Sequence, residues 1–157
     1  MIAPIDVQLN AEEVAKAERV ARRRAAESTH LADKHGFTGD GMVIDLVGAP
    51  AEAAGCKALG LVWSGSVNHF KLPDARHNIQ FRGTMLEHGS LIVRPDDDDR
   101  DYFALVTGHT PNFRVMGWML GRDAKKLKWL RSPGGRPPAW FVPQGYLRTD
   151  FSGLLAT

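Results

Sequence analysis

Hydrophobic and polar positions alternate most clearly in the second half of the chain, where the pattern predicts β-strands. Residues 113–120 place Phe, Val, Gly and Met at alternate positions, so these side chains would occupy one face of a strand. Shorter apolar runs predict further strands at 67–70, 79–84, 91–93, 102–107 and 140–142. These elements predict an α+β fold with a central mixed β-sheet of about four or five strands flanked by helices.

Two helices are predicted before the sheet. The first begins at Asn10, which is a good N-cap, and ends before Gly36. Its apolar stripe is thin and mostly alanine, so we expect a long, partly exposed helix that packs weakly or contacts a partner chain. The second begins near Pro50, which suits a first turn, and ends before Gly60. Its residues are small or apolar nearly all round, so we expect this helix to be buried.

Composition fits one globular chain with a single core. It has 157 residues, of which 43% are hydrophobic and 24% charged. Cys56 is the only cysteine, so no internal disulfide can form, which fits a reducing compartment. No stretch reaches the roughly 20 apolar residues of a membrane span, and the first residues lack a secretory pattern. We expect a cytoplasmic protein without membrane contact, with a helical N-terminal arm at 1–36 and an α+β domain at 37–157.

The strand predicted at 79–84 carries the most informative chemistry. Gln80 and Arg82 share one face of this strand, while Ile79 and Phe81 take the other. Asp74 lies shortly before it, so a carboxylate, an amide oxygen and a cation would come together. A magnesium-dependent phosphodiesterase requires oxygen ligands for a hard cation and a positive charge near the attacked phosphate.

Glu52 is a second candidate, because it lies on the helix that we expect to be buried. Ala49, Cys56 and Leu59 share its side of that helix. A carboxylate in such surroundings costs several kcal/mol unless it is paired or bound to a metal. Two interpretations are open. Glu52 is a metal ligand, or it forms a salt bridge with a core arginine or is exposed at the helix end.

The segment from Pro73-Asp74 to Gln80-Phe81-Arg82 resembles the core motif of the PD-(D/E)XK nuclease superfamily, with arginine at the position of the lysine. Glu52 matches the glutamate that the superfamily carries on the helix before its core sheet. The chain also resembles short bacteriophage-encoded proteins from about Gly48 to Leu147. That resemblance rests on four motifs, which are Glu52-Ala53, Leu59-Gly60-Leu61, Val67-Asn68-His69-Phe70-Lys71-Leu72-Pro73-Asp74 and Gly117-Trp118.

The resemblance implies a restriction-endonuclease-like core and metal-dependent hydrolysis of nucleic-acid phosphodiesters, that is, a nuclease. Mg²⁺ or Mn²⁺ would be held by Glu52, Asp74 and Gln80, and Arg82 would stabilise negative charge on the phosphate. Arginine stays protonated, with a pKa above about 12, so a metal-bound hydroxide or Lys71 would act as the base. The superfamily also includes members that only bind. The alternatives are a catalytically silent protein that binds nucleic acid or a host defence protein, and an oligomeric accessory protein.

Positive charge gathers between residues 122 and 136, although the net charge of the chain is only +2. Asp123 is the one acid in this segment, against the cations Arg122, Lys125, Lys126, Lys128, Arg131 and Arg136. We expect nucleic-acid phosphates to be contacted by Lys71, Arg122, Lys125, Lys126 and Lys128. The other interpretation is the solvated face of a helix at 123–130. DNA is the expected partner rather than RNA, and a homodimer through the N-terminal helix is the other expected contact.

The acidic run at 95–101 is predicted to be a solvated hairpin turn between two strands. It contains four consecutive aspartates, but it lacks the alternating acids, central glycine and distal glutamate of an EF-hand loop. The run therefore does not predict a calcium site.

Overall fold

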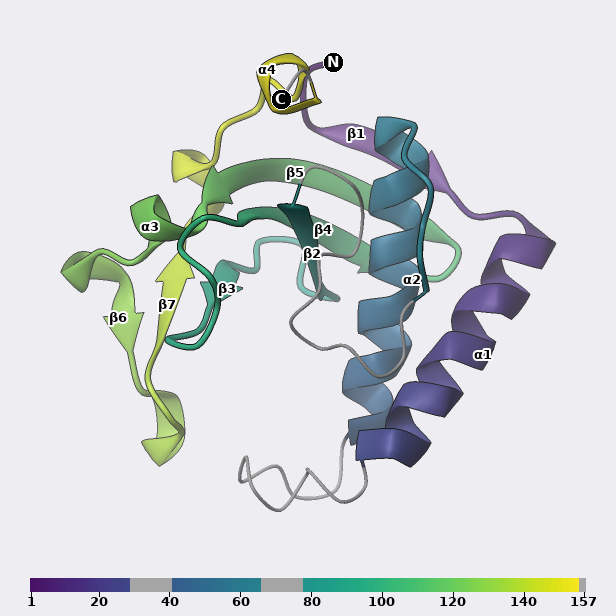
Figure 1. The fold of residues 1–157 in the computed structure, drawn as a ribbon, viewed down its shortest axis with the longest axis horizontal. Helices are drawn as coiled ribbons and strands as arrows, with labels where there is room; N and C mark the ends of the chain where they lie inside the picture. Colours follow the sequence, from purple (N-terminus) through teal and green to yellow (C-terminus); the bar gives the residue numbers. More distant parts are fainter. Residues whose placement is uncertain (29–40, 66–77, 156–157) are drawn as a thin grey trace.

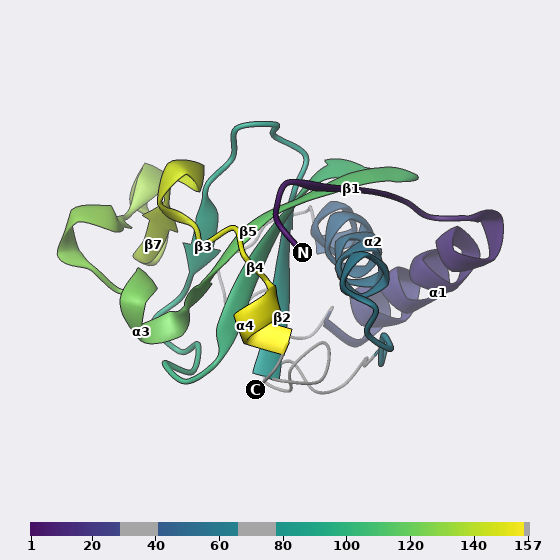
Figure 2. The same ribbon diagram turned by 90° about the horizontal axis from the view of Figure 1, so that it is seen from above.

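The structure is a computed structural model that describes residues 1–28, 41–65 and 78–155. These residues form an α+β fold of three layers (Figures 1 and 2), with α1 and α2 on one side, a mixed four-stranded sheet in the middle and a three-stranded sheet beyond it. The helices are α1 (Ala11–Ser28), α2 (Gly41–Leu59), α3 (Gly121–Ala124) and α4 (Ser152–Leu155). The strands are β1 (Ile5–Gln8), β2 (Ile79–Thr84), β3 (Leu91–Val93), β4 (Tyr102–His109), β5 (Asn112–Leu120), β6 (Leu130–Arg131) and β7 (Ala139–Val142).

The four-stranded sheet has the order β1-β5-β4-β2. β4 and β5 form an antiparallel hairpin, β1 pairs antiparallel with β5, and β2 lies parallel to β4. β4 is covered on both faces, so residues 103–107 are all buried. The strands that the sequence predicts at 79–84 and 113–120 are therefore present as β2 and β5.

The four-stranded sheet separates two hydrophobic cores. α2 packs on one face, where Ile79 and Phe81 of β2 lie beside Ala104 of β4. The other face carries Phe103 and Leu105 and is covered by the small sheet, whose order is β3-β7-β6. Alternate residues of one strand thus belong to different cores, as the period of two requires.

The contact between α2 and β2 is closest at Gly55. A Cβ atom at this position would lie 2.3 Å from Cδ1 of Phe81. Only a residue without a side chain lets the helix lie directly against the ring, which explains a glycine in the middle of a buried helix.

α2 is longer than the sequence predicts. It begins at Gly41 rather than near Pro50, so residues 42–47 belong to the helix and the proline lies inside it. A proline inside a helix removes one backbone hydrogen bond, a local cost that tertiary packing can override. The helix predicted at 123–130 is instead α3, a 3-10 turn at Leu127–Trp129 and β6. The strand predicted at 67–70 lies outside the described residues.

The described part of segment 1–36 is integrated into the fold rather than forming a weakly packed arm. β1 extends the main sheet, and α1 runs along α2 (Figure 1). Val20 and Ala21 of α1 are buried against Ala49 of α2, with Trp63 beside them. The thin alanine stripe therefore contacts a helix of the same chain, because small side chains allow two helices to approach closely.

The acidic run does not form a hairpin turn. β3 pairs with β7, whereas β4 lies between β2 and β5. The segment between β3 and β4 consequently connects the two sheets. Short apolar strands specify a buried position but not a pairing partner, which is why the hairpin prediction was wrong.

Among the helices that the structure describes, none combines the length and the apolar character that crossing a membrane requires.

Candidate functional site

Glu52 is held by two residues from outside its own helix. The two terminal guanidinium nitrogens of Arg24, Nη1 and Nη2, donate hydrogen bonds to its carboxylate, with Nη2 lying 2.8 Å from Oε1. The indole Nε1 of Trp63 donates to the same Oε1 at 3.2 Å. The side chains of Arg24 and Glu52 are only 12% and 9% exposed. Of the two interpretations of Glu52, the structure shows the salt bridge with a core arginine, which neutralises the buried carboxylate.

Gln80 and Arg82 share one face of β2, as the alternation predicts, but that face is turned away from α2. Gln80 lies opposite Phe103 in the register of β2 with β4, and the Arg82 guanidinium lies 5.0 Å from the centre of the Phe103 ring. Phe103 belongs to the core beneath the small sheet. The sheet therefore lies between Glu52 and Gln80, and the structure does not bring them into one site.

The predicted metal-binding set is not assembled among the residues that the structure describes. Asp74 and Lys71 lie outside those residues. Of the remaining two ligands, Glu52 is engaged by Arg24 on the helix side, and the Oε1 atom of Gln80 accepts a hydrogen bond from Arg82. Within the described ranges, no three His, Cys, Asp or Glu side chains gather closely enough to hold a metal ion.

Gln80 and Arg82 instead form hydrogen bonds with two aspartates of the acidic run, Asp97 and Asp101. We call these four residues the β2 polar chain. Nε2 of Gln80 donates to Oδ2 of Asp101 at 2.7 Å. Nη2 of Arg82 donates to Oε1 of Gln80 at 3.1 Å and to Oδ1 of Asp97 at 2.8 Å. The backbone N–H of Arg94 donates to the other oxygen of Asp97 at 2.7 Å. The β2 polar chain thus links β2 to the segment that connects the two sheets.

The two aspartates of the β2 polar chain differ from their neighbours in the acidic run. Asp97 and Asp101 are each 7% exposed, and burial raises the pKa of Asp101 while its hydrogen bond from Gln80 opposes that rise. Asp98 is exposed, and hydrogen bonds from Arg100 lower its pKa to about 2. The expectation of a solvated run therefore holds for Asp96, Asp98 and Asp99, which are exposed, and fails for the two buried carboxylates of Asp97 and Asp101.

The sequence contains a signal that could have identified these aspartates. Arg82 lies on a strand with apolar neighbours, and a cation in such a position needs a carboxylate partner nearby. After Arg82, the first carboxylate along the chain is Glu87, and the acidic run at 95–101 follows it. Its four consecutive aspartates made solvation the simpler interpretation.

The second feature is the segment of residues 121–147, which contains β6 and β7 of the small sheet and which we call the cationic lobe. It projects from the side of the main sheet opposite α1 and α2 (Figure 2). Its exposed cations are Arg122, Lys126, Lys128, Arg131 and Arg136. Lys125 differs from them, because its ammonium group donates to the carbonyl of Asp97 at 2.7 Å and forms an ion pair with Asp99. Lys125 therefore fastens the acidic segment rather than offering a free charge.

Aromatic and aliphatic side chains lie among the cations of the lobe. The ammonium group of Lys128 lies 4.7 Å from the ring centre of Trp129 and 4.8 Å from that of Tyr146. Tyr146 is 56% exposed and Leu127 is 85% exposed. Both the solvated-helix interpretation and the predicted helix at 123–130 are thus replaced by an irregular surface that combines positive charge with exposed apolar groups.

Comparison of the chain with protein-family models, with curated proteins and with solved structures finds no match. The candidate sites are therefore the β2 polar chain and the cationic lobe, both defined by their geometry. The first is an internal network with buried members, and the second is open to a partner.

Proposed function

We propose that this protein binds nucleic acid through the cationic lobe. The observation that carries the proposal is the combination of exposed cations with exposed aromatic and aliphatic side chains on one small projecting lobe. Lys and Arg side chains contact phosphates and release counterions, while apolar and aromatic groups contact bases or sugars. The chain as a whole is nearly neutral, so attraction to phosphate depends on this local concentration of charge.

Lys126 and Lys128 are the side chains on which this proposal depends most. They flank Leu127, the most exposed large apolar residue of the lobe. Arg122 and Arg131 lie exposed on either side of them along the chain. The logarithm of the binding constant falls linearly with the logarithm of the salt concentration. Each phosphate that such cations neutralise makes this slope steeper by about 0.7 to 0.9.

The test compares two variants with the same change in net charge. Lys126→Gln/Lys128→Gln removes two cations of the lobe, whereas Arg22→Gln/Arg23→Gln removes two exposed cations of α1 on the other side of the molecule. Affinity for a fluorescently labelled DNA oligonucleotide is measured by anisotropy at several salt concentrations. We expect the lobe variant to bind at least about tenfold more weakly and to lose about two units of salt slope.

The α1 variant should bind DNA nearly as the wild type does. An equal loss in both variants would show attraction by overall charge and would contradict a site on the lobe. Absence of measurable binding by the wild type, to single-stranded and double-stranded DNA alike, would contradict the proposed function itself.

Metal-dependent hydrolysis, with the restriction-endonuclease-like core that it implies, is the second candidate function. The observation that favours it is the shared face of Gln80 and Arg82, which also carries the buried carboxylates of Asp97 and Asp101. The donor set Glu52, Asp74 and Gln80 does not fit a metal in its described members, so we derive no reaction step through one.

Cleavage of single- and double-stranded DNA with Mg²⁺ or Mn²⁺ tests the second candidate. Hydrolysis on the β2 face should be lost in Asp101→Asn and should survive in Glu52→Gln, because Glu52 lies on the other side of the sheet. Hydrolysis that is lost in Glu52→Gln while the variant remains folded would contradict this assignment. Absence of any metal-dependent cleavage by the wild type would leave nucleic-acid binding as the proposed function.

A further inference from the structure

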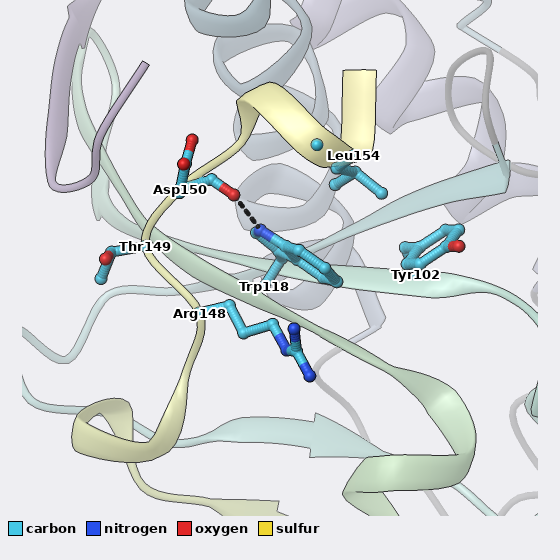
Figure 3. Close-up of a pocket in the computed structure, with 7 residues that line it drawn as sticks. Tyr102, Trp118, Arg148, Thr149, Asp150 and Leu154 are labelled. Atoms are coloured by element: carbon cyan, nitrogen blue, oxygen red, sulfur yellow. Dashed lines mark hydrogen bonds between the residues drawn. The ribbon is translucent and has the colours of Figure 1, made fainter. Parts of the chain in front are cut away.

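A groove of about 520 Å³ lies where the C-terminal segment crosses the ends of β4 and β5 (Figure 3). Its aromatic walls are Tyr102 at the start of β4 and Trp118 near the end of β5. Residues 148–150 and 153–154 form the rest of its lining. Tyr102 and Trp118 are half-buried and Arg148 is exposed, so the groove is accessible from solvent and has an apolar interior.

Backbone contacts hold the groove in place. Trp118 and Arg148 exchange two backbone hydrogen bonds of 2.9 Å each, and the indole Nε1 of Trp118 donates to the carbonyl of Asp150 at 2.9 Å. Gly117 has a φ of +153°, and a Cβ atom there would lie 2.8 Å from the carbonyl oxygen of Arg148. The glycine therefore permits the C-terminal segment to lie against β5, and the aromatic wall is formed before any ligand arrives.

The side chains of the groove suit a flat ring that carries a nearby negative charge. The rings of Tyr102 and Trp118 meet edge to face, with centres 5.6 Å apart at an angle of 75°. The Arg148 guanidinium lies 5.4 Å from the centre of the Trp118 ring. An aromatic surface with an adjacent guanidinium is the arrangement by which proteins hold an unpaired nucleobase and its phosphate.

Asp150 is the acidic group in the groove lining, and its carboxylate does not face the place where the base and its phosphate would bind. Oδ1 of Asp150 accepts the backbone N–H of Ser152 at 2.9 Å. The carboxylate points away from the Trp118 ring and from Arg148 (Figure 3). Only the backbone carbonyl of Asp150 faces the indole, and that atom already accepts a hydrogen bond from it.

The groove is continuous with the cationic lobe. Tyr146 and Arg148 are both exposed and lie on either side of the buried residue Leu147 in the sequence. Tyr146 contacts Lys128 of the lobe, and Arg148 contacts Trp118 of the groove. Residues 146–148 thus connect a cation and ring pair of the lobe with a cation and ring pair of the groove.

We propose that the groove formed by Tyr102, Trp118 and Arg148 receives an unpaired base of single-stranded DNA whose phosphates lie on the cationic lobe. This inference rests on the proposed nucleic-acid binding and adds the class of ligand, a single strand. A base inside a duplex is stacked and paired, so its faces cannot contact the groove, whereas each base of a single strand offers a free face.

The test uses two oligonucleotides with the same number of phosphates, a twelve-residue oligothymidylate and an abasic strand of the same length. We expect the wild type to bind oligothymidylate about tenfold or more tightly than the abasic strand, since stacking on aromatic side chains requires a base. Tyr102→Leu and Trp118→Leu should reduce that ratio towards one. Lys126→Gln/Lys128→Gln should weaken binding to both strands and leave the ratio unchanged.

A second measurement uses the wild-type protein and so does not depend on whether these variants fold. It is fluorine nuclear magnetic resonance of protein labelled with 5-fluorotryptophan. The chain has four tryptophans, and the resonance of Trp118 is identified by its loss in Trp118→Phe. In the wild type this resonance should shift on addition of oligothymidylate and stay in place on addition of the abasic strand.

Four outcomes would overturn the subsite. Equal affinity for the two strands would refute it while leaving the proposed nucleic-acid binding intact. A preference for duplex over single-stranded DNA, or an unchanged Trp118 resonance at saturating oligothymidylate, would do the same. Failure to bind either strand or duplex would refute the proposed function, and the subsite with it.

Discussion

At the scale of single residues, Arg82 is the side chain on which the β2 polar chain depends. The same nitrogen, Nη2, donates to both Gln80 and Asp97. The Asp97 side chain is only 6% exposed, so its charge is shielded from water and relies on this cation.

Replacement of Arg82 should therefore reduce stability more than a surface substitution would. We expect Arg82→Ala to lower the free energy of unfolding by about 3 kcal/mol, because it removes the cation from a buried carboxylate. Arg82→Lys keeps the charge but loses the guanidinium geometry, and should cost about 1 kcal/mol. Urea unfolding monitored by circular dichroism measures both values. A stability of Arg82→Ala within about 0.5 kcal/mol of the wild type, the range of ordinary surface changes, would contradict this role.

Asp101 should give the protein a measurable pH dependence. Burial raises its pKa in the folded state above that of the unfolded chain, so the folded state binds this proton more tightly. The contribution of Asp101 to stability is therefore greatest below the unfolded pKa of about 4 and is lost as the pH rises through the folded pKa. Asp101→Asn has no charge to desolvate and can still accept the hydrogen bond from Gln80.

Thermal unfolding of the two proteins between pH 3.5 and 7 checks the sign. The melting temperature of Asp101→Asn relative to the wild type should increase with pH across this window. A difference that is constant with pH, or that decreases, would show that the carboxyl group is not strained by burial.

Residue roles divide into those that local pattern predicts and those that it does not. The shared face of Gln80 and Arg82 follows from the period of a strand and could be predicted from six consecutive residues. The partner of Glu52 could not, because Arg24 lies 28 positions away on another helix. Burial of Glu52 was foreseeable from its apolar helix, but that burial is compatible with a metal or with an arginine, and only the packing of α1 on α2 distinguishes them.

At the scale of secondary-structure elements, the position of α2 depends on glycine at the point of closest approach to β2. Small residues along α2 predicted its burial correctly. Its start at Gly41 was missed because Pro50 is a stronger local signal than the apolar run before it. β1 and β6 were missed for a related reason, since strands of two to four residues carry little alternation. β3 and β7 were predicted as strands, but their pairing into a separate sheet was not.

Gly55→Ala should disturb this contact, and Gly48→Ala supplies a matched control on the same helix. A Cβ atom at Gly55 would lie 2.3 Å from the Phe81 ring, whereas nothing lies within 4 Å of one at Gly48. We expect Gly55→Ala to lower the free energy of unfolding by about 1–3 kcal/mol, as overpacking does. Gly48→Ala should raise it by up to about 1 kcal/mol through helix propensity. Equal effects at both positions, measured by urea unfolding, would show that the helix does not lie against the ring.

At the scale of the whole molecule, the two ends of the described chain are built into one structure. β1 pairs with β5, and the backbone N–H of Phe151 donates to the carbonyl of Met1. Ala3 and Leu9, on either side of β1, belong to the core beneath α2. The cationic lobe lies on the face of the main sheet opposite α1 and α2, so the sheet separates the lobe from these two helices (Figure 2).

Removal of residues 1–9 should therefore damage the fold, in contrast to the separable arm that the sequence suggested. The truncation deletes an edge strand, exposes the edge of β5 and removes two core side chains. We expect loss of cooperative thermal unfolding or formation of soluble aggregates, measured by calorimetry and size-exclusion chromatography. A monomeric truncation with a sharp transition near that of the wild type would contradict the integration of β1.

The pairing of β1 with β5 also has a consequence for biosynthesis. Asp6 of β1 and Arg114 of β5 form an ion pair between strands although they are 108 positions apart. A ribosome adds about 5–20 residues each second, so β1 leaves it roughly 5–20 s before its partner strand has been made. Until then the first strand of the nascent chain has no sheet to join, and the main sheet gains this edge only after β5 has been synthesised.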